Sequence, residues 1–401
     1  MYTKTYSMNK RFSSIIIIFF AIVFSIGYSC QKPPNDDAPP PNNDDTKDLY
    51  LPATPYDYVN ANAAIPAYIK NFINSDPEID NTPSNNPITN HGATLGRVLY
   101  YDKALSVNNK TSCASCHHQN KAFTDGVATS EGFNAGHTRR NAMSTVNVRY
   151  FKEKKMFWDI RAATLEEQVL LPITDSIEMG MPSLTALESK LKAISYYPDL
   201  FKNAFGTSDI TTDRISKALS QFLRSIVSFN SKYDQGLASN FSNFTSQELQ
   251  GKQLLIRLNC VECHSDLTTL GSGTHPTFII VENSGFNTGF GSNNALDLNY
   301  TDNGIGEKTG LAKDMGTFKM PTLRNVALTA PYMHDGRFQT LEQVVDHYNK
   351  GAKKHPNIGV QIPNGGYGFL TEADKAAIVA FLKTLTDESL ITNPKYSSPF
   401  K

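Results

Sequence analysis

Four of the five cysteines belong to two copies of one short pattern. The copies read Cys113-Ala114-Ser115-Cys116-His117 and Cys260-Val261-Glu262-Cys263-His264. Cys-x-x-Cys-His is the attachment pattern for c-type haem: the two thiols bond to the haem vinyl groups, and the adjacent histidine reaches the iron. The sequence therefore predicts two covalently bound haems c, with His117 and His264 as their proximal ligands.

Zinc binding and thiol redox chemistry are the alternatives for these cysteines. Two Cys-x-x-Cys pairs could supply four zinc thiolates, and one pair could be a redox dithiol. Neither needs a histidine directly after each pair. The pairs also stand much farther apart than the pairs of an ordinary zinc ribbon. Two haems are the better interpretation.

Helical patterns dominate the sequence around the two haem motifs. Residues 215–229 are amphipathic, and Thr340 and Thr371 each begin a helix-capping pattern. A chain of 401 residues suggests two or three domains. We therefore expect a mainly α fold: two cytochrome c-like haem domains packed together, over residues 61–240 and 241–395. Residues 265–310 are rich in Gly, Asn, Thr and Ser, which predicts long loops.

The N-terminus is typical of an export signal. A basic start and a short apolar core lead to Cys30, which indicates a lipoprotein-type signal over residues 1–30 and a lipid anchor on Cys30. Ordinary cleavage and an uncleaved anchor are alternatives. Residues 31–60 are Pro-, Asn- and Asp-rich and predict a flexible linker. We expect a periplasmic or outer-membrane lipoprotein of a Gram-negative bacterium. Balanced charge, 38 basic against 38 acidic residues, argues against nucleic-acid binding.

Residues 90–390 resemble the bacterial dihaem cytochrome c peroxidase family, which also contains MauG. The family reads Phe-Trp-Asp-Gly-Arg-Ala, then a Gln ten positions after the Trp, then a Glu-Met. Trp158, Gln168 and Glu178 match at these spacings. The further matching segments are Ser112–His117, Arg140-Asn141, Pro321–Asn325 and Leu328–Gly336. Ile160 stands where the family usually has Gly, a departure expected to affect only a turn.

The resemblance implies roles for the three spaced residues. Glu178 would be the acid-base group beside the N-terminal haem, Gln168 would lie next to it on the same distal side, and Trp158 would pass electrons between the haems. Taken alone, a single tryptophan is more often a packing residue, and a glutamate more often a solvated one. The resemblance further implies a calcium ion, held by Asn141 with the carbonyl groups of Thr329 and Pro331.

The resemblance leaves the sixth iron ligands to be identified. Tyr348 stands where most family peroxidases have a methionine ligand to the second haem, so we expect a phenolate ligand there, as in MauG. A buried core tyrosine is the alternative, with His347 and Met333 as other candidate ligands. At the first haem, His137 lies in the loop that carries a removable distal histidine in the family, but four positions late. An ordinary loop residue is the alternative.

The resemblance implies a peroxidase that reduces hydrogen peroxide to water with electrons from a small cytochrome c or a cupredoxin. One alternative is a MauG-like oxidase of a protein or a small molecule, which Tyr348 favours. Another is a plain dihaem electron carrier, which would leave Gln168 and Glu178 without a role. The resemblance also allows a homodimer.

Overall fold

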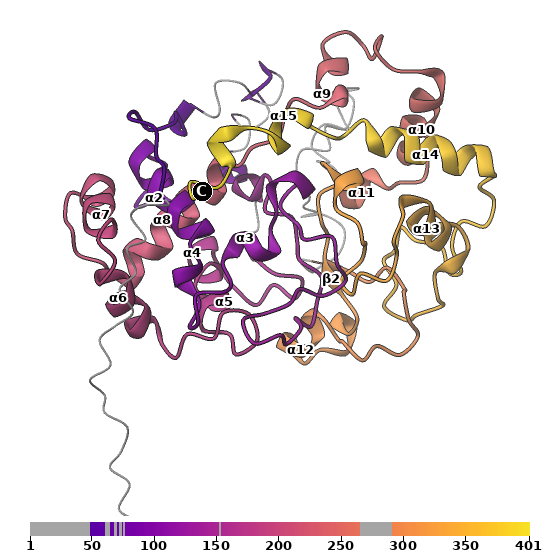
Figure 1. The fold of residues 1–401 in the computed structure, drawn as a ribbon. Helices are drawn as coiled ribbons and strands as arrows, with labels where there is room; N and C mark the ends of the chain where they lie inside the picture. Colours follow the sequence, from indigo (N-terminus) through magenta and orange to yellow (C-terminus); the bar gives the residue numbers. More distant parts are fainter. Residues whose placement is uncertain are drawn as a thin grey trace, which may run out of the picture. The chain divides into compact units, whose positions relative to one another are not determined.

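A computed structural model describes residues 49–60, 65–67, 70, 71, 74, 77–151, 154–264 and 291–401. The predicted signal with Cys30, most of the predicted linker and residues 265–290 lie outside the described residues. Within the described part, the fold is mainly α, with irregular segments joining the helices (Figure 1). No described helix is long and apolar enough to cross a membrane.

The first helix pair is formed by α2 (Asn90–Tyr101) and α8 (Thr212–Ser225). Thr89 caps α2 by accepting a hydrogen bond from the Gly92 amide, and α8 buries one apolar face. The helices approach closely at Gly96, where a Cβ atom would stand 1.9 Å from the Ala218 carbonyl oxygen. Only glycine fits this crossing.

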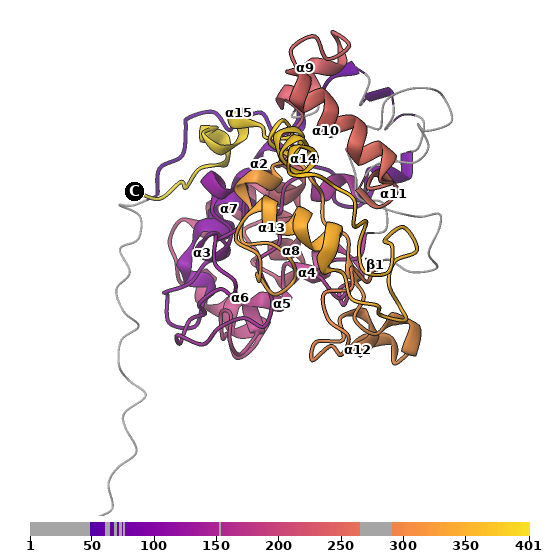
Figure 2. The same cartoon turned by 90° about the vertical axis from the view of Figure 1, so that its right-hand side faces the viewer.

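A second pair of helices packs closely at a glycine in the same way. It consists of α10 (Ser246–Arg257) and α14 (Glu372–Lys383), which pack together in both views (Figures 1 and 2). A Cβ atom on Gly251 would stand 1.9 Å from the Ala377 carbonyl oxygen. Each pair therefore has a glycine on the helix that precedes a haem motif, packed against the backbone of the later helix.

Short elements fill the rest of the described chain. The helices are α3 (Cys113–Cys116), α4 (Leu165–Gln168), α5 (Leu171–Thr174), α6 (Leu184–Lys192), α7 (Tyr197–Phe205), α9 (Lys232–Leu237), α11 (Val261–His264), α12 (Ile305–Thr309), α13 (Leu341–Asp346) and α15 (Glu388–Ile391). The one sheet in the described residues pairs β1 (Gly291–Ser292) with β2 (Phe318–Lys319) in antiparallel register, Gly291 opposite Lys319. Single 3₁₀ turns connect several of these elements.

The structure corrects two of the predicted elements. The amphipathic segment ends as a helix at Ser225 rather than at residue 229, because Ile226 leaves the helical conformation and Ser228 donates its amide to Asn147 Oδ1 instead. The described end of the predicted loop, residues 291–310, contains β1 and α12. The capping patterns at Thr340 and Thr371 are confirmed, since both side chains accept the expected backbone hydrogen bonds.

Two separate hydrophobic cores lie in the described chain. The first extends from Tyr58 to Ile226 and the second from Tyr233 to Leu385. Residues 388–400 return to the first core, where Leu390 and Tyr396 are buried. The predicted domain limits, 61–240 and 241–395, stay a prediction.

Candidate haem and peroxide site

The first haem motif is held by a short helix and a tight turn. Ser112 caps the start of α3, and its amide donates a hydrogen bond to Ser115 Oγ. After His117 the chain turns back through Ala122 and Phe123, both at positive φ. This turn brings the Phe123 carbonyl oxygen to 2.9 Å from His117 Nδ1. Nδ1–H donates to that oxygen, which leaves the Nε2 lone pair available for a metal.

The second motif uses the same device with a distant partner. His264 ends α11, and its Nδ1 lies 3.1 Å from the carbonyl oxygen of Pro321, 57 residues later in the chain. Burial lowers the pKa of both histidines, so the rings are neutral at physiological pH. Neutral imidazole with a fixed Nδ1–H is the form that binds iron through Nε2.

The cysteines fit thioether attachment and not the zinc alternative. Within the described residues, no three His, Cys, Asp or Glu side chains are grouped to hold a metal ion, so the two pairs do not meet in one four-thiolate site. Burial raises the pKa of the Cys113 thiol to about 12 and that of Cys116 to about 11. Reactive dithiols have lowered thiol pKa values instead.

A cavity of about 430 Å³ opens beside the first motif. Its lining includes Cys116, His117, Trp158, Gln168 and Glu178. This volume is typical of sites for organic ligands. The cavity thus brings the three spaced family residues together with a thiol and an imidazole suited to a haem.

Among the acidic residues that line this cavity, Glu178 has the most strongly shifted pKa. Burial and, to a smaller extent, the nearby Asp175 raise its pKa to about 7, while Arg161 acts in the opposite direction. The Glu178 amide donates to Asp175 Oδ1 at 3.0 Å, which fixes the backbone. A carboxyl group that titrates near neutrality can both accept and release a proton.

An ion pair between α4 and α8 positions Gln168. Gln168 ends α4, and Glu166 of the same helix accepts hydrogen bonds from the nearly buried guanidinium of Arg224 on α8. Ser216 of α8 also donates its hydroxyl to the Glu166 carbonyl oxygen at 2.7 Å. The Thr164 side chain caps α4 by accepting a hydrogen bond from the Glu167 amide. These contacts hold α4, and so Gln168, against α8.

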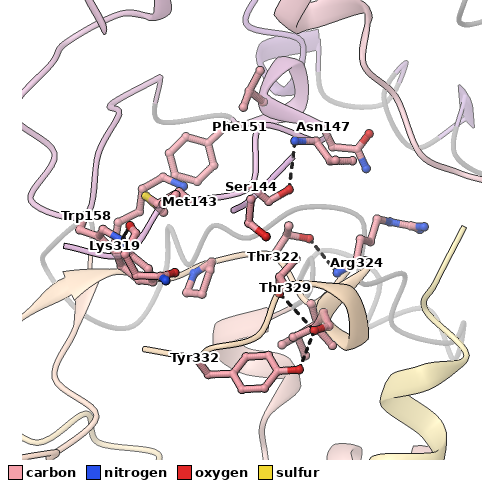
Figure 3. Close-up of a pocket in the computed structure, with 18 of the residues that line it drawn as sticks. Met143, Ser144, Asn147, Phe151, Trp158, Lys319, Thr322, Arg324, Thr329 and Tyr332 are labelled. Carbon is pink, nitrogen blue, oxygen red and sulfur yellow. Dashed lines mark hydrogen bonds between the residues drawn. The ribbon is translucent and has the colours of Figure 1, made fainter. Parts of the chain in front are cut away.

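Trp158 lines two cavities. It lines the larger cavity and also a smaller one, of about 130 Å³, which Pro321 borders (Figure 3). Its indole Nε1–H donates to the Asn141 carbonyl oxygen at 2.9 Å, and its own carbonyl accepts from the Lys319 amide at 2.7 Å. Trp158 is therefore anchored by segments that adjoin both haem motifs.

Arg140 forms ion pairs that hold the Trp158 segment in place. Arg140 pairs with Asp159, next to Trp158, at 2.5 Å, and its Nε lies 2.7 Å from Asp302 Oδ2. Only 9% of the Arg140 side chain is exposed. An ion pair so well shielded from water is screened little, so it holds the Trp158 segment to residue 302.

The predicted calcium ligands line the smaller cavity together. Asn141, Thr329 and Pro331 all border it, and Figure 3 shows Thr329 across the cavity from Trp158. Asn141 donates its Nδ2 to the Val127 carbonyl oxygen at 2.8 Å, and its Oδ1 takes no hydrogen bond from the described residues. Amide and carbonyl oxygens suit calcium.

Tyr348 and His137, the first candidates for the sixth ligands of the two haems, have different surroundings. Tyr348 is half-buried, and both Cys260 and Cys263 act electrostatically on its phenol. It stands in a π-helical turn, His347–Gly351, that directly follows α13. His137 is exposed, lies outside the lining of the larger cavity, and has its Nδ1 3.3 Å from the Thr129 carbonyl oxygen. Ligation by His137 stays a prediction.

Comparisons with known proteins agree with this arrangement. The profile of the di-haem cytochrome c peroxidase family matches residues 90–241. The methylamine utilization protein MauG of Methylorubrum extorquens is 31% identical over 322 residues, which are 80% of this chain and 85% of that protein. The chain belongs to the di-haem cytochrome c peroxidase family. Its membership accounts for the two haem motifs and implies two c-type haems.

Members of the family with different named activities are similarly close. The cytochrome c551 peroxidase of Nitrosomonas europaea is 32% identical, over 74% of this chain and 80% of that protein. Among solved structures, a MauG-like protein associated with microbial copper homeostasis is 34% identical, with a TM-score of 0.69 over 79% of this chain and 95% of that one. The diheme peroxidase BthA of Burkholderia thailandensis is 25% identical, with a TM-score of 0.63, over 78% of this chain and 91% of that one.

Removing the thiols of one motif should remove one haem from this family member. We expect the Cys260→Ala, Cys263→Ala double variant to carry half the covalent haem of the unaltered protein, because a haem without thioether bonds is lost on denaturation. Haem quantified on denaturing gels measures this. Full haem content in the variant would contradict the assignment. Cys30→Ala is the control, since Cys30 lies outside both motifs.

Proposed function

We propose that the protein reduces hydrogen peroxide to water with electrons from a small cytochrome c or a cupredoxin. The observation that carries this proposal is Glu178, whose pKa burial raises to about 7 in the cavity that His117 also lines. A plain electron carrier needs no acid-base group there. When bound, the haems supply the redox-active iron for this reaction, held by Cys113, Cys116 and His117 and by Cys260, Cys263 and His264.

Glu178 performs the proton transfer in this proposal. Its carboxylate takes the proton from one peroxide oxygen and delivers it to the other, which leaves as water. Gln168, which also lines the cavity, donates its amide to the bound peroxide and orients it. Two electrons and two further protons complete the conversion of one peroxide into two waters.

Trp158 carries electrons between the two haem sites in this proposal. We expect Trp158→Phe to lose most of its steady-state turnover with a cytochrome donor, because phenylalanine is much harder to oxidise. The reaction of the first haem with one equivalent of peroxide should keep its rate. Stopped-flow absorbance follows both. Unchanged donor oxidation would contradict the role. Phe157→Leu, an adjacent aromatic on the same loop, is the matched control.

Further features are proposed with this activity. A calcium ion at Asn141, Thr329 and Pro331 would stiffen the segment in which the Asn141 carbonyl oxygen holds the Trp158 indole. The protein would be exported and anchored to a membrane through a lipid on Cys30, and a homodimer is compatible with the family. His137 would be a removable ligand of the first haem.

The deciding experiment uses the purified ferric protein. Optical and electron paramagnetic resonance spectra are recorded before and after one equivalent of peroxide, then with a reduced small cytochrome c. Rapid reaction at the first haem, followed by catalytic oxidation of the cytochrome, supports the peroxidase. Reaction with peroxide but no oxidation of cytochrome or cupredoxin overturns it in favour of the second candidate.

That second candidate is a MauG-like oxidase of a protein or small molecule. Tyr348 favours it, because a phenolate ligand stabilises ferric iron and hinders reduction by an ordinary donor. In the oxidase, the oxidising equivalents from peroxide would reach the substrate through Trp158. The Tyr348→Phe variant should lose the low-spin signal of the second haem if the phenolate is its ligand.

A further inference from the structure

A third cavity, of about 580 Å³, shares no lining residue with the two cavities beside Trp158. Three of its lining side chains are lysines, Lys155, Lys308 and Lys313, and Asp314 is the acidic one among the described lining residues. Its apolar lining residues are Ile160, Ile305, Leu311, Pro356 and Ile358. This lysine-lined cavity has a volume typical of sites for organic ligands.

Segments far apart in the sequence form a connected frame around the lysine-lined cavity. α12 lies next to the β1–β2 pair in both views (Figures 1 and 2). The turn at residues 355–359 is fastened to the chain that follows each of these elements. Asn357 Nδ2 donates to the Ala312 carbonyl oxygen at 2.6 Å, after α12. The Gly359 amide donates to the Asn293 carbonyl oxygen at 2.8 Å, after β1. Walls connected in this way need little ordering when a ligand binds, which favours affinity.

Two of the lysines have no carboxylate partner among the described residues. The Lys308 ammonium donates to the carbonyl oxygens of Ile160 and Arg161, at 3.2 and 2.8 Å. Because an ammonium has three N–H donors, one stays available. The Lys313 ammonium makes no hydrogen bond or ion pair with any described residue. Since Asp314 is a single carboxylate against three lysines, the lining keeps an excess of positive charge and has donors for an anion.

A hydroxyl group in the lining also has no partner within the described part of the chain. Ser292 lines the cavity, and its Oγ is shielded from solvent without a hydrogen bond to any described residue. Buried polar atoms without a partner are uncommon in folded proteins. A Cβ atom on Gly359 would stand 2.4 Å from this oxygen, so the glycine leaves it space. Ser292 can therefore donate a hydrogen bond to a ligand in the cavity.

We propose that the lysine-lined cavity binds a small organic anion with an apolar body. Lys308 and Lys313 hold the charged group, Ser292 donates a hydrogen bond, and the apolar lining residues contact the body of the ligand. Inorganic phosphate would leave the apolar walls uncovered, and a neutral apolar molecule would leave the ammonium groups without a counter-charge. The site goes beyond the proposed function, and it places the ligand against the loop that carries Trp158, because Ile160 lines the cavity.

Isothermal titration calorimetry of the purified holoprotein, without peroxide or an electron donor, tests the site. The probes are 2-naphthoate, which is an apolar carboxylate, its neutral analogue 2-naphthalenemethanol, and inorganic phosphate. We expect 2-naphthoate to bind in a one-to-one ratio with a Kd below about 1 mM. It should bind more tightly than either of the other probes, because only 2-naphthoate combines a negative charge with an apolar body.

Single substitutions in the lining locate the probe. Lys313→Gln removes a charge whose side chain holds no other described residue, and it should weaken 2-naphthoate binding by about fivefold. Lys308→Gln should act similarly, because glutamine keeps N–H donors for the two carbonyl oxygens but carries no charge. Leu311→Ser changes a wall residue that is 49% exposed, so the fold should tolerate it while 2-naphthoate binds more weakly. Lys202→Gln is the matched control, since Lys202 is exposed and lies outside the lining.

One-to-one binding of 2-naphthoate that weakens in both lysine variants and in Leu311→Ser, with the control unchanged, supports the proposal. Phosphate binding as tight as that of 2-naphthoate would show a site for inorganic anions and overturn it. Absence of saturable binding also overturns it, as does binding that both lysine variants leave unchanged, because the probe then binds elsewhere. The peroxidase proposal is tested by the reaction with peroxide, so either proposal can fail without the other.

Discussion

Glu178→Gln should lower the rate of reaction with peroxide by about 100-fold or more, the usual contribution of a general acid-base group. Glutamine keeps the shape of the side chain but cannot accept a proton. The reaction of unaltered protein should also slow as the pH falls below about 7, because burial raises the pKa of Glu178 to about 7 and the carboxyl group is protonated below it. Stopped-flow absorbance of the ferric protein, without a donor, measures both effects.

The pH profile separates a chemical role from a structural one. In Glu178→Gln the remaining slow reaction should show no fall in rate near pH 7, because the titrating group is gone. Glu167→Gln is the matched control: Glu167 is exposed, lies outside the lining of the larger cavity, and accepts a hydrogen bond from the Ala163 amide. A fall near pH 7 that persists in Glu178→Gln would assign the titration to another group.

Asp234→Asn should lower the free energy of unfolding by about 3–5 kcal/mol. Its carboxylate makes a two-pronged ion pair with Arg324, at 2.8 Å for each contact, and the two side chains are 1% and 0% exposed. Removing the carboxylate leaves a guanidinium charge in the interior without its counter-charge. Denaturant unfolding followed by circular dichroism measures the change.

Two further variants test this explanation. Asp346→Asn removes an exposed ion pair with Lys375 and should cost at most about 1 kcal/mol. Replacing both buried partners, Asp234→Leu with Arg324→Met, should cost less than Asp234→Asn alone, because no charge then remains in the core. An equal or larger loss in the double variant would show that the segment needs the ion pair for its geometry.

Local sequence patterns predicted local structure well. The haem attachment pattern can be recognised from the residues of a single turn. The caps at Thr340 and Thr371 can be recognised from the three residues that follow each threonine. The mainly α fold follows from such patterns. The end of α8 was missed because Ile226 remains apolar and in phase with the helix. The helix stops where the Ser228 amide donates a hydrogen bond to the side chain of the distant Asn147.

The contacts that orient the candidate site were beyond the reach of sequence patterns. The partner of His264 is a backbone carbonyl 57 residues away, and a carbonyl group has no sequence signal. The turn at Tyr348 widens into a π-helix, which shifts side-chain directions from those of the predicted α-helix. Ile160 occupies a positive-φ position, where glycine would be expected, and its side chain is buried.

The return of residues 388–400 to the first core bears on how the protein is assembled. Gln119, two residues after His117, donates to the carbonyl oxygens of Leu390 and Asn393, and Tyr101 donates to that of Tyr396. During synthesis this stretch emerges after both haem motifs. Haem-attaching enzymes would therefore meet the first motif in a chain whose surrounding core is still open. A fragment that ends near residue 240 would lack these contacts, so the first haem-bearing half should not mature alone.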